Sequence, residues 1–298
     1  MTPIFTFKLY NVSVDGKVAL PEGGIALIEE RAFQLLERKI YQEKSLQVKG
    51  YRDSYVKRRI GVRMRAHGVS SYVEYVRILN SSPEEYDLLL GNLTINVTQF
   101  FRDESTFEAL KKDVLPQLIS TKRERGQRMI KAWCAGCATG EEPYSVAMLF
   151  RLVLGPEISS WMVKVYGTDI DQMSLQKARE GKYERIASFE GRELKEYFDF
   201  NGQCKLKTMV KQMVRFKHYD LTSGHWSNHF DLIVCRNVLI YFSPSLQEEL
   251  LHTFYHCLNK DGYLVLGKTE TLLGESRKMF NPVNIRECIH QKLAEAKV

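Results

Sequence analysis

The sequence predicts an α/β fold in which a Rossmann-like, mostly parallel sheet follows an N-terminal helical domain. Three observations lead to this prediction. A strand-like run at 129–133 is followed by a glycine-containing turn and a helical run at 146–154, and a second strand-like run at 161–169 comes next. Residues 25–92 instead carry apolar side chains mostly at helical spacing. Strand, helix and strand in succession imply a parallel sheet with right-handed crossovers.

Length and composition are those of a soluble globular protein with one large domain or two ordinary ones. The chain has 298 residues, of which 44% are hydrophobic and 27% charged. No apolar run approaches the roughly 18 residues of a membrane span, the N-terminus lacks a signal-peptide pattern, and six dispersed cysteines fit a reducing compartment. We therefore expect a cytoplasmic protein, and its net charge of +7 indicates an acidic partner.

The first 24 residues are predicted to form an extended arm whose role the sequence does not indicate. Phe5, Phe7 and Leu9 alternate as in a strand, and Pro21–Gly24 is expected to break the chain. The helical domain is expected to begin after this break.

A basic segment at 49–65 is the candidate partner-binding surface of the helical domain. It holds seven lysine and arginine residues against one acid, Asp53. Apolar residues at every fourth position would form the buried stripe of a helix, namely Val56, Ile60 and Met64. The arginines would then stand together on the exposed side of the helix. Scattered charges on such a face are usually only solvated, but a surplus of one sign, mostly arginine, suits a partner with carboxylate or phosphate groups. Tyr51 and Tyr55 are the only nearby aromatic residues, a poor platform for stacking nucleic-acid bases.

The turn after the first strand is the candidate ligand site. Gly136 and Gly140 allow positive φ angles and let a ligand approach bare backbone. Glu141 and Glu142 follow directly, and their charge would repel a phosphate group. Carboxylates at this position instead suit hydroxyl groups or a cation.

The second strand ends in an acid at the place where Rossmann-like proteins hold ribose hydroxyls. Asp169 is the candidate for that role, and the alternative role of helix cap suits Asp171 better. The rest of the chain is expected to form a short helix at 190–200, a hairpin at about 203–218 appended to the sheet, a strand at 230–235, a helix at 245–259, a strand at 262–267 and final strands between 283 and 289.

Two cysteine and histidine patterns are poor candidates for redox or metal chemistry. Cys134 and Cys137 match the W-C-x-x-C shape of thioredoxin-like sites, but the acidic pair that follows would raise a thiol pKa. His252 and His256 stand four apart without the glutamate of a zinc-protease motif. No metal site is predicted.

Four motifs stand together in the order typical of one family. They are NLTINVTQFFRD at 92–103, GCATGEEPYS at 136–145, TDID at 168–171 and CRNVLIYF at 235–242. Over roughly residues 25–290 the chain resembles the CheR-type chemoreceptor glutamate O-methyltransferases, and four ordered motifs are far more specific than any one alone.

This resemblance implies a division into three parts. After the arm at 1–24, residues 25–92 would form a helical receptor-recognition domain. Residues 93–298 would form a class I methyltransferase domain that depends on S-adenosylmethionine and carries a small inserted β-hairpin subdomain at about 201–218. The shortness of that hairpin resembles family members that need no tethering peptide on the receptor.

The resemblance also implies site residues and a reaction. The S-adenosylmethionine site would be lined by Asn96, Thr98, Arg102, Glu142, Asp169, Asp220, Leu221, Arg236 and Asn237. Arg102 and Tyr241 would face the substrate as catalytic residues. Receptor binding would rest on Arg59, Arg63 and Arg65. The protein would act as a cytoplasmic monomer on the helical domain of membrane chemoreceptors, and it would esterify glutamate and release S-adenosylhomocysteine, without nucleic acid or membrane insertion.

The chemistry of the residues agrees with this reaction. Carboxylates such as Glu142 and Asp169 suit a sulfonium cation with ribose hydroxyls. A glutamate acceptor is ionised at neutral pH, so it needs positioning rather than a general base. Two alternatives stay open: a non-catalytic module that binds S-adenosylmethionine or S-adenosylhomocysteine and acts by docking, and a methyltransferase for a small molecule or nucleic acid.

Overall fold

The computed structural model describes residues 22–294, with the exception of 45, 95, 186, 201–202, 225 and 227–228. The arm expected at 1–24 therefore lies outside the described residues up to position 21. The break expected at Pro21–Gly24 is wrong for residues 22–24, because they already belong to the first helix. Within the described part of the chain, no helix combines the length and apolarity needed to cross a membrane.

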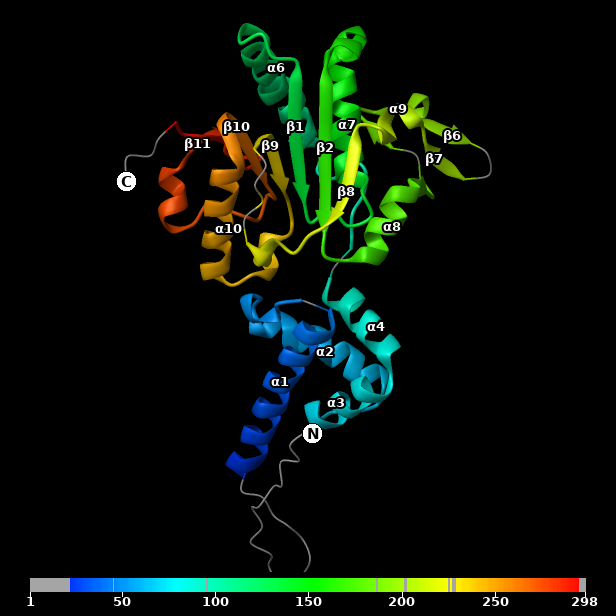
Figure 1. Cartoon of the computed structure of the whole chain (residues 1–298), viewed down its shortest axis with the longest axis vertical. Helices are drawn as coiled ribbons and strands as arrows, with labels where there is room; N and C mark the ends of the chain where they lie inside the picture. Colours follow the sequence, from blue (N-terminus) through cyan, green and yellow to red (C-terminus); the bar gives the residue numbers. More distant parts are fainter. Residues whose placement is uncertain are drawn as a thin grey trace, which may run out of the picture.

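Four α-helices build the described part of the N-terminal domain, which lies below the sheet in Figure 1. They are α1 (Glu22–Lys44), α2 (Asp53–Ala66), α3 (Tyr72–Ser81) and α4 (Pro83–Leu93). The stripe predicted for α2 is confirmed, since Val56, Ile60 and Met64 are all buried in the core of this domain. Its burial, rather than helix propensity, holds α2 in place.

A seven-stranded sheet forms the second domain, in the order β11-β12-β10-β9-β1-β2-β8. The strands are β1 (Met129–Ala135), β2 (Met162–Asp169), β8 (Val214–His218), β9 (Phe230–Cys235), β10 (Leu258–Leu266), β11 (Phe280–Asn284) and β12 (Ile289–Lys292). The five strands from β10 to β8 run parallel, and β12 and β11 are antiparallel additions at one edge. The order reverses between β1 and β9, which is where open α/β sheets bind ligands.

Helices cover the sheet on both faces, as a parallel sheet requires. The helices of this domain are α5 (Glu104–Ala109), which continues through a π-helical turn (Leu110–Val114) into α6 (Leu115–Glu124), then α7 (Glu141–Leu154), α8 (Gln172–Glu180), α9 (Thr208–Lys211) and α10 (Pro244–Cys257). One apolar core joins α6 and α7 to the sheet, and a second lies between the other face and α10.

The segment between α8 and β8 departs from the sequence-based expectation. The short helix expected at 190–200 is wrong: these residues form β5 (Arg192–Glu193), one 3-10 turn (Lys195–Tyr197) and β6 (Phe198–Phe200). The strand β6 pairs with β7 (Cys204–Leu206), and β7 pairs with β3 (Lys182–Tyr183), so they form a separate three-stranded sheet. A two-stranded ribbon joins β5 to β4 (Ser188–Phe189).

The hairpin expected at 203–218 is also wrong. Its first half, β7, belongs to the small sheet, but its second half, β8, runs parallel to β2 at the edge of the main sheet. Val214 is buried there in the apolar core of the second domain. Loose alternation marks both segments as strands, but it does not identify the strand with which each one pairs.

The two domains are joined by backbone pairing as well as by side chains. Tyr51 and Phe242 form an isolated antiparallel bridge, the Arg52 amide donates to the Tyr241 carbonyl at 2.9 Å, and the Ser243 amide donates to the Gly50 carbonyl at 2.9 Å. The helical domain thereby abuts the end of the sheet toward which the arrowheads of β1 and β2 point in Figure 1.

Candidate active site

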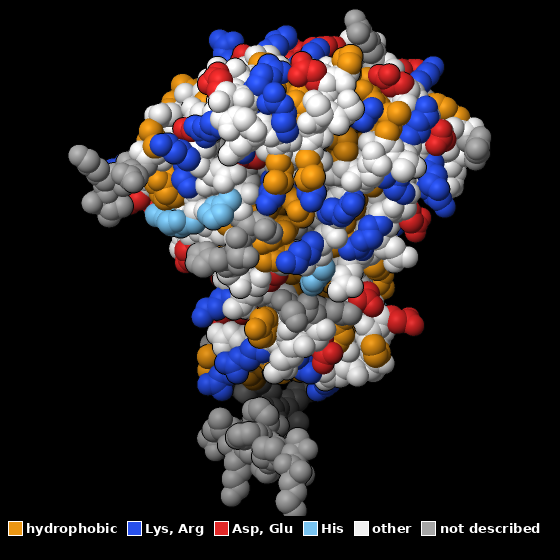
Figure 2. All heavy atoms as spheres, turned by 45° about the horizontal axis from the view of Figure 1, so that its top comes forward, with side chains coloured by type: hydrophobic (Ala, Val, Ile, Leu, Met, Phe, Trp, Pro, Cys, Tyr) orange, Lys and Arg blue, Asp and Glu red, His pale blue; other side chains and the backbone are white. Residues whose placement is uncertain are grey.

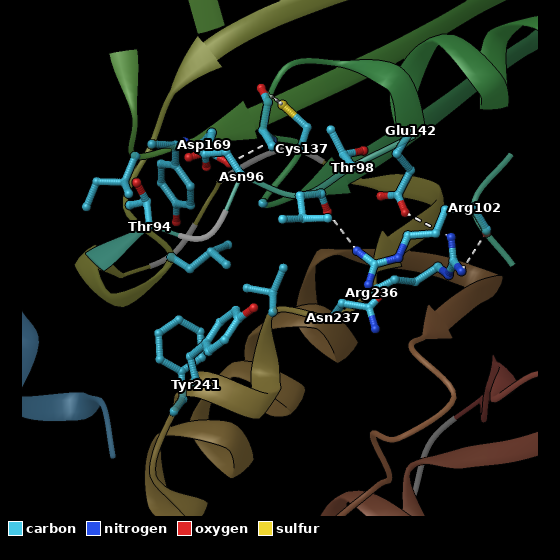
Figure 3. Close-up of a pocket in the computed structure, with 18 of the residues that line it drawn as sticks. Thr94, Asn96, Thr98, Arg102, Cys137, Glu142, Asp169, Arg236, Asn237 and Tyr241 are labelled. Carbon is cyan, nitrogen blue, oxygen red and sulfur yellow. Dashed lines mark hydrogen bonds and ion pairs between the residues drawn. The ribbon is translucent and has the colours of Figure 1, made fainter. Parts of the chain in front are cut away.

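A cleft opens where β1, β2 and β9 end, and the linker between the two domains, residues 94–103, forms part of its lining. It encloses about 1040 Å³, part of it open to solvent. All nine residues proposed for the cofactor, and Tyr241, line this one cleft. In Figure 3, Glu142, Arg102 and Arg236 group at one end, Asn96 and Asp169 at the other, and Tyr241 stands across from them. The structure thus brings together residues from four separated motifs.

The glycine turn after β1 has the expected backbone. Gly136 and Gly140 have φ angles of +74° and +93°. A Cβ atom on Gly136 would lie 2.5 Å from Cγ2 of Val238, so a side chain here would collide with the opposite wall. Gly136 therefore allows the two walls of the cleft to approach each other.

Asp169 is held rigidly at the end of β2. Its Oδ2 accepts the Ala138 amide at 2.8 Å, and its Oδ1 accepts the Asp171 amide at 2.9 Å. Burial raises the pKa of Asp169, while these backbone bonds oppose that shift. A carboxylate has about four lone-pair positions, so both oxygens retain capacity for ligand hydroxyls. Asp171 caps α8 through the Met173 amide, as predicted.

Glu142 and Arg236 form the charged end of the cleft. Arg236 is 2% exposed at its side chain, and its Nη1 lies 3.3 Å from Oε2 of Glu142. Its Nη2 is occupied elsewhere, by Asp103 at 2.5 Å and by the Arg102 carbonyl at 2.8 Å. The ion pair with Glu142 is therefore long and shared. Burial raises the pKa of Glu142 to about 7, although Arg236 opposes the shift.

Arg102 sits on a strained turn that Arg236 braces. The residues on either side, Phe101 and Asp103, have φ angles of +49° and +56°, a region unfavourable to side chains larger than glycine. Nη1 of Arg102 donates one hydrogen bond to the Val97 carbonyl, at 2.8 Å. Its other N–H groups have no hydrogen-bond partner among the described residues, and they remain available to a ligand or substrate.

The remaining lining residues differ in what they can offer. The Asn96 amide donates to Asp171 at 2.6 Å, so it ties the linker to α8. Oδ1 of Asp220 caps the Thr222 amide at 2.8 Å. Oδ1 of Asn237 is buried without a partner among the described residues, as a group that awaits a ligand would be. Thr98 and Leu221 line the wall between these groups.

Tyr241 connects the cleft to the basic helix. Its ring centroid lies 4.8 Å from that of Tyr55 on α2. The guanidinium groups of Arg58 and Arg59 lie 5.8 and 5.9 Å from the Tyr55 ring. Burial raises the pKa of Tyr241, which keeps its hydroxyl protonated at neutral pH. The basic face of α2 therefore borders the cleft.

The three arginines proposed for receptor binding do not share one environment. Arg65 is exposed and Arg59 is half-buried beside Tyr55. Arg63 instead makes a two-bond ion pair with the buried Glu85 of α4, through Nε at 2.9 Å and Nη2 at 2.6 Å. The structure therefore does not present Arg63 with the other two, and Arg58 takes its place beside Arg59.

Both cysteines of the W-C-x-x-C motif lie inside the protein. Cys134 and Cys137 are free and buried, and burial, with nearby carboxylates, raises the pKa of both thiols. The described residues contain no group of three or more histidine, cysteine, aspartate or glutamate side chains that could hold a metal ion.

Two acids of this region were not identified from the sequence. Asp103 pairs with Arg236, and Glu270 accepts backbone amides from the loop that carries Asn237. The available signal for Glu270 was its position just after an apolar strand at the carboxyl end of the sheet.

Comparison with known families agrees with this geometry. Residues 96–289 match the family model "CheR methyltransferase, SAM binding domain", and residues 31–94 match "CheR methyltransferase, all-alpha domain". The first of these alone spans more than half of the chain.

Curated relatives cover most of the chain. The chemotaxis protein methyltransferase of Escherichia coli is 31% identical over 82% of this chain and 85% of its own length. Chemotaxis protein methyltransferase 1 of Pseudomonas aeruginosa is 34% identical over 73% and 81%, and the chemotaxis protein methyltransferase of Borreliella burgdorferi is 33% identical over 74% and 80%.

The donor set of the cleft fits S-adenosylmethionine. Glu142, Asp169 and Asp220 offer carboxylates to a cation and to hydroxyls, whereas a phosphate-bearing cofactor would meet repulsion. The side-chain carbonyl of Asn237, which has no partner among the described residues, adds a polar group to the lining. At Gly136 the absence of a side chain lets the two walls lie close together. On the matched models, the relatives and this donor set together, the chain belongs to the CheR methyltransferase family and has an S-adenosylmethionine-binding domain.

Proposed function

We propose that this protein transfers a methyl group from S-adenosylmethionine to glutamate side chains of chemoreceptors, giving glutamate methyl esters in chemotaxis adaptation. The observation that carries the proposal is the contact between the cleft and the basic helix: Tyr241 packs on Tyr55, which Arg58 and Arg59 flank. A negatively charged helical surface that docks on α2 would bring its carboxylates to the mouth of the cleft.

The cofactor would be held by side chains that complement its charge and its hydrogen-bonding groups. Glu142 would receive its ammonium group and Asp169 its ribose hydroxyls, with Asn96, Thr98, Asp220, Leu221, Arg236 and Asn237 forming the remaining wall. When bound, S-adenosylmethionine supplies an electrophilic methyl group on a sulfonium centre.

The acceptor needs no base, because a glutamate carboxylate is ionised at neutral pH. Arg102 orients that carboxylate through its free N–H donors, and the protonated hydroxyl of Tyr241 adds one further donor. One oxygen of the acceptor carboxylate would form the new bond to the methyl carbon, and the electron pair of the broken sulfur–methyl bond would leave with S-adenosylhomocysteine. The main contribution of the protein is the in-line placement of the two groups.

Charge reversal on α2 tests this assignment. In Arg59→Glu with Arg65→Glu, we expect kcat/KM for a purified receptor fragment to fall about 100-fold, because two attractive contacts become repulsive. The affinity for S-adenosylhomocysteine should stay within about twofold. Arg31→Glu with Arg38→Glu, on exposed positions of α1, changes the charge equally and should leave methylation unchanged.

The product identifies the acceptor. Methyl label transferred to a receptor glutamate should be released as methanol in alkali. Alkali-stable label would contradict a carboxyl ester and favour another acceptor, and cofactor binding without turnover on any receptor would favour the docking-module alternative.

A further inference from the structure

One wall of the cofactor cleft is an irregular turn that follows β9. Arg236, Asn237, Val238 and Tyr241 all face the cleft from this turn. Asn237 has a φ angle of +60°, in the left-handed region. Such a turn leaves backbone amides without the partners that a helix or strand would supply, so something else must hold them.

Glu270 accepts those amides. It lies in the loop after β10, its side chain is buried with 6% exposure, and β10 runs beside β9. Its Oε2 accepts the Asn237 amide at 3.0 Å, and its Oε1 accepts the Val238 amide at 2.8 Å and the Ile240 amide at 3.3 Å. Oε2 also accepts the Gly267 amide at 2.6 Å, within the loop of Glu270 itself.

The bonding pattern requires an ionised carboxylate. Both oxygens act only as acceptors, and four amide dipoles replace a counter-cation. Burial raises the pKa of Glu270, and the four backbone bonds oppose that shift. Bonds from amides to a charged acceptor are among the stronger hydrogen bonds in proteins, and their loss leaves buried donors unpaired.

We propose that Glu270 is a positioning residue, whose buried carboxylate fixes the turn after β9 so that Asn237 and Tyr241 face the bound cofactor and substrate. It touches neither group and acts through the backbone. Burial is the main cause of the raised pKa of both Glu142 and Tyr241, and the nearby charge of Glu270 adds to it. Arg236 and Arg102 oppose the shift at Glu142, and Arg102 opposes it at Tyr241.

The test compares Glu270→Gln with Glu275→Gln. Glutamine keeps the size of the side chain, but its NH₂ group cannot accept an amide bond and it carries no charge. Glu275 is a matched control, since its side chain is 68% exposed and, among the residues that the structure describes, pairs only with Lys278. The readouts are affinity for S-adenosylhomocysteine by calorimetry between pH 6 and 8.5, near-UV circular dichroism and Tm.

For Glu270→Gln we expect the affinity at pH 8 to fall about 10- to 100-fold, because a small displacement of the wall misplaces its contacts. The pH at which affinity declines should move downward, because one charge that opposes ionisation of Glu142 is gone. A purely structural role would lower Tm without moving that pH profile. Glu275→Gln should match the wild type in both measurements.

A folded Glu270→Gln with wild-type affinity and an unchanged pH profile would overturn the proposal. If Glu270→Gln does not fold, Glu270→Asp replaces it in the test. Aspartate keeps the charge but is shorter, so the pH profile should stay unchanged while the affinity falls about tenfold. Wild-type affinity in Glu270→Asp would also overturn the proposal. The part that concerns Tyr241 and the acceptor rests on the proposed function. Binding of S-adenosylhomocysteine requires no receptor, so a failure of the receptor assignment would leave this result intact.

Discussion

The helical domain and the cleft each hold an arginine–glutamate pair with one fully buried and one half-buried member, and the two pairs are built in opposite ways. Glu85 receives two bonds from Arg63, one from the Tyr75 hydroxyl at 2.7 Å and one from His67 at 2.9 Å. Glu142 receives one long contact from Arg236, a side chain that is shared with Asp103. Donors lower the pKa of Glu85 to about 2 against the desolvation of burial, whereas burial raises the pKa of Glu142 to about 7.

The difference separates a pair whose carboxylate is fully hydrogen-bonded from one whose carboxylate is under-coordinated. Glu85 has all the partners that a buried charge needs, so the pair stabilises the packing of α2 on α4. Glu142 lacks them, and a cation that enters the cleft would supply what is missing. A carboxylate left under-coordinated in a cleft is a feature of binding sites.

The largest effect is expected from Glu85→Gln. It leaves the Arg63 guanidinium, which is 19% exposed, without its anion. We expect unfolding free energy to fall by about 4 kcal/mol, as for other broken buried pairs, with little change in affinity for S-adenosylhomocysteine. Urea unfolding measures the first and calorimetry the second. Glu84→Gln, exposed and adjacent, is the control and should change neither quantity. A loss below about 1 kcal/mol would remove the contrast between the two pairs.

Glu142→Gln should show the opposite pattern, a large loss of affinity with no loss of stability. We expect affinity for S-adenosylhomocysteine to fall about 100-fold, equivalent to about 2.7 kcal/mol, because the carboxylate that would face the ligand ammonium is gone. The unfolding free energy at pH 8 should be equal to or above that of the wild type, because an under-paired buried charge is removed. Glu141→Gln, whose partner is Thr139 and which lies outside the cleft lining, should keep near-normal affinity.

The pH dependence of stability should distinguish the pairs by sign. Both glutamates have an ordinary pKa of 4.5. The folded pKa of Glu85 is depressed, so its contribution is present above pH 4.5 and is lost as pH falls toward about 2. The folded pKa of Glu142 is raised, so the folded state binds more protons than the unfolded state between pH 4.5 and about 7, and stability declines as pH rises through that window. Each shift corresponds to about 3 kcal/mol.

Urea unfolding of the wild type and of both glutamine variants from pH 3 to 8 measures these slopes. Glu142→Gln should remove the decline between pH 4.5 and 7, and Glu85→Gln should remove the acid-side loss. An unchanged profile in either variant would show that another group titrates there.

Tyr75→Phe gives the smallest effect. It removes one of four donors to Glu85 and leaves the ion pair intact. We expect a loss of about 1 kcal/mol in unfolding free energy, measured by urea unfolding. A loss as large as that of Glu85→Gln would mean that the hydroxyl, rather than Arg63, holds the carboxylate.

The sequence was sufficient for the parts that depend on local pattern. Strand-to-turn transitions at 129–140 and 161–169 place Glu142 and Asp169 at one edge of a parallel sheet, so their approach follows from topology. The stripe on α2 follows from its period. The roles of the lining residues stay a prediction.

The parts that depend on distant partners could not be predicted in this way. The helical row that contains Arg59 and Arg63 gives no indication that Glu85 of another helix captures one of them. Glu270 acts on amides about thirty residues away, and amides leave no mark in a sequence. The apolar and polar residues of β8 alternate as in one strand of a hairpin. Its partner is instead β2, which α8 and the strands of the small sheets separate from it along the chain.

The bridge between Tyr51 and Phe242 has a consequence for biosynthesis. The two sides of this junction are 190 residues apart, as the bond from Arg52 to the Phe242 carbonyl shows. At ribosomal speeds of about 5–20 residues per second, roughly 10 to 40 s separate their emergence. The helical domain leaves the ribosome first. Its face that carries Tyr51 and Tyr55 stays uncovered until the segment with Tyr241 and Phe242 has been synthesised and can pack against it.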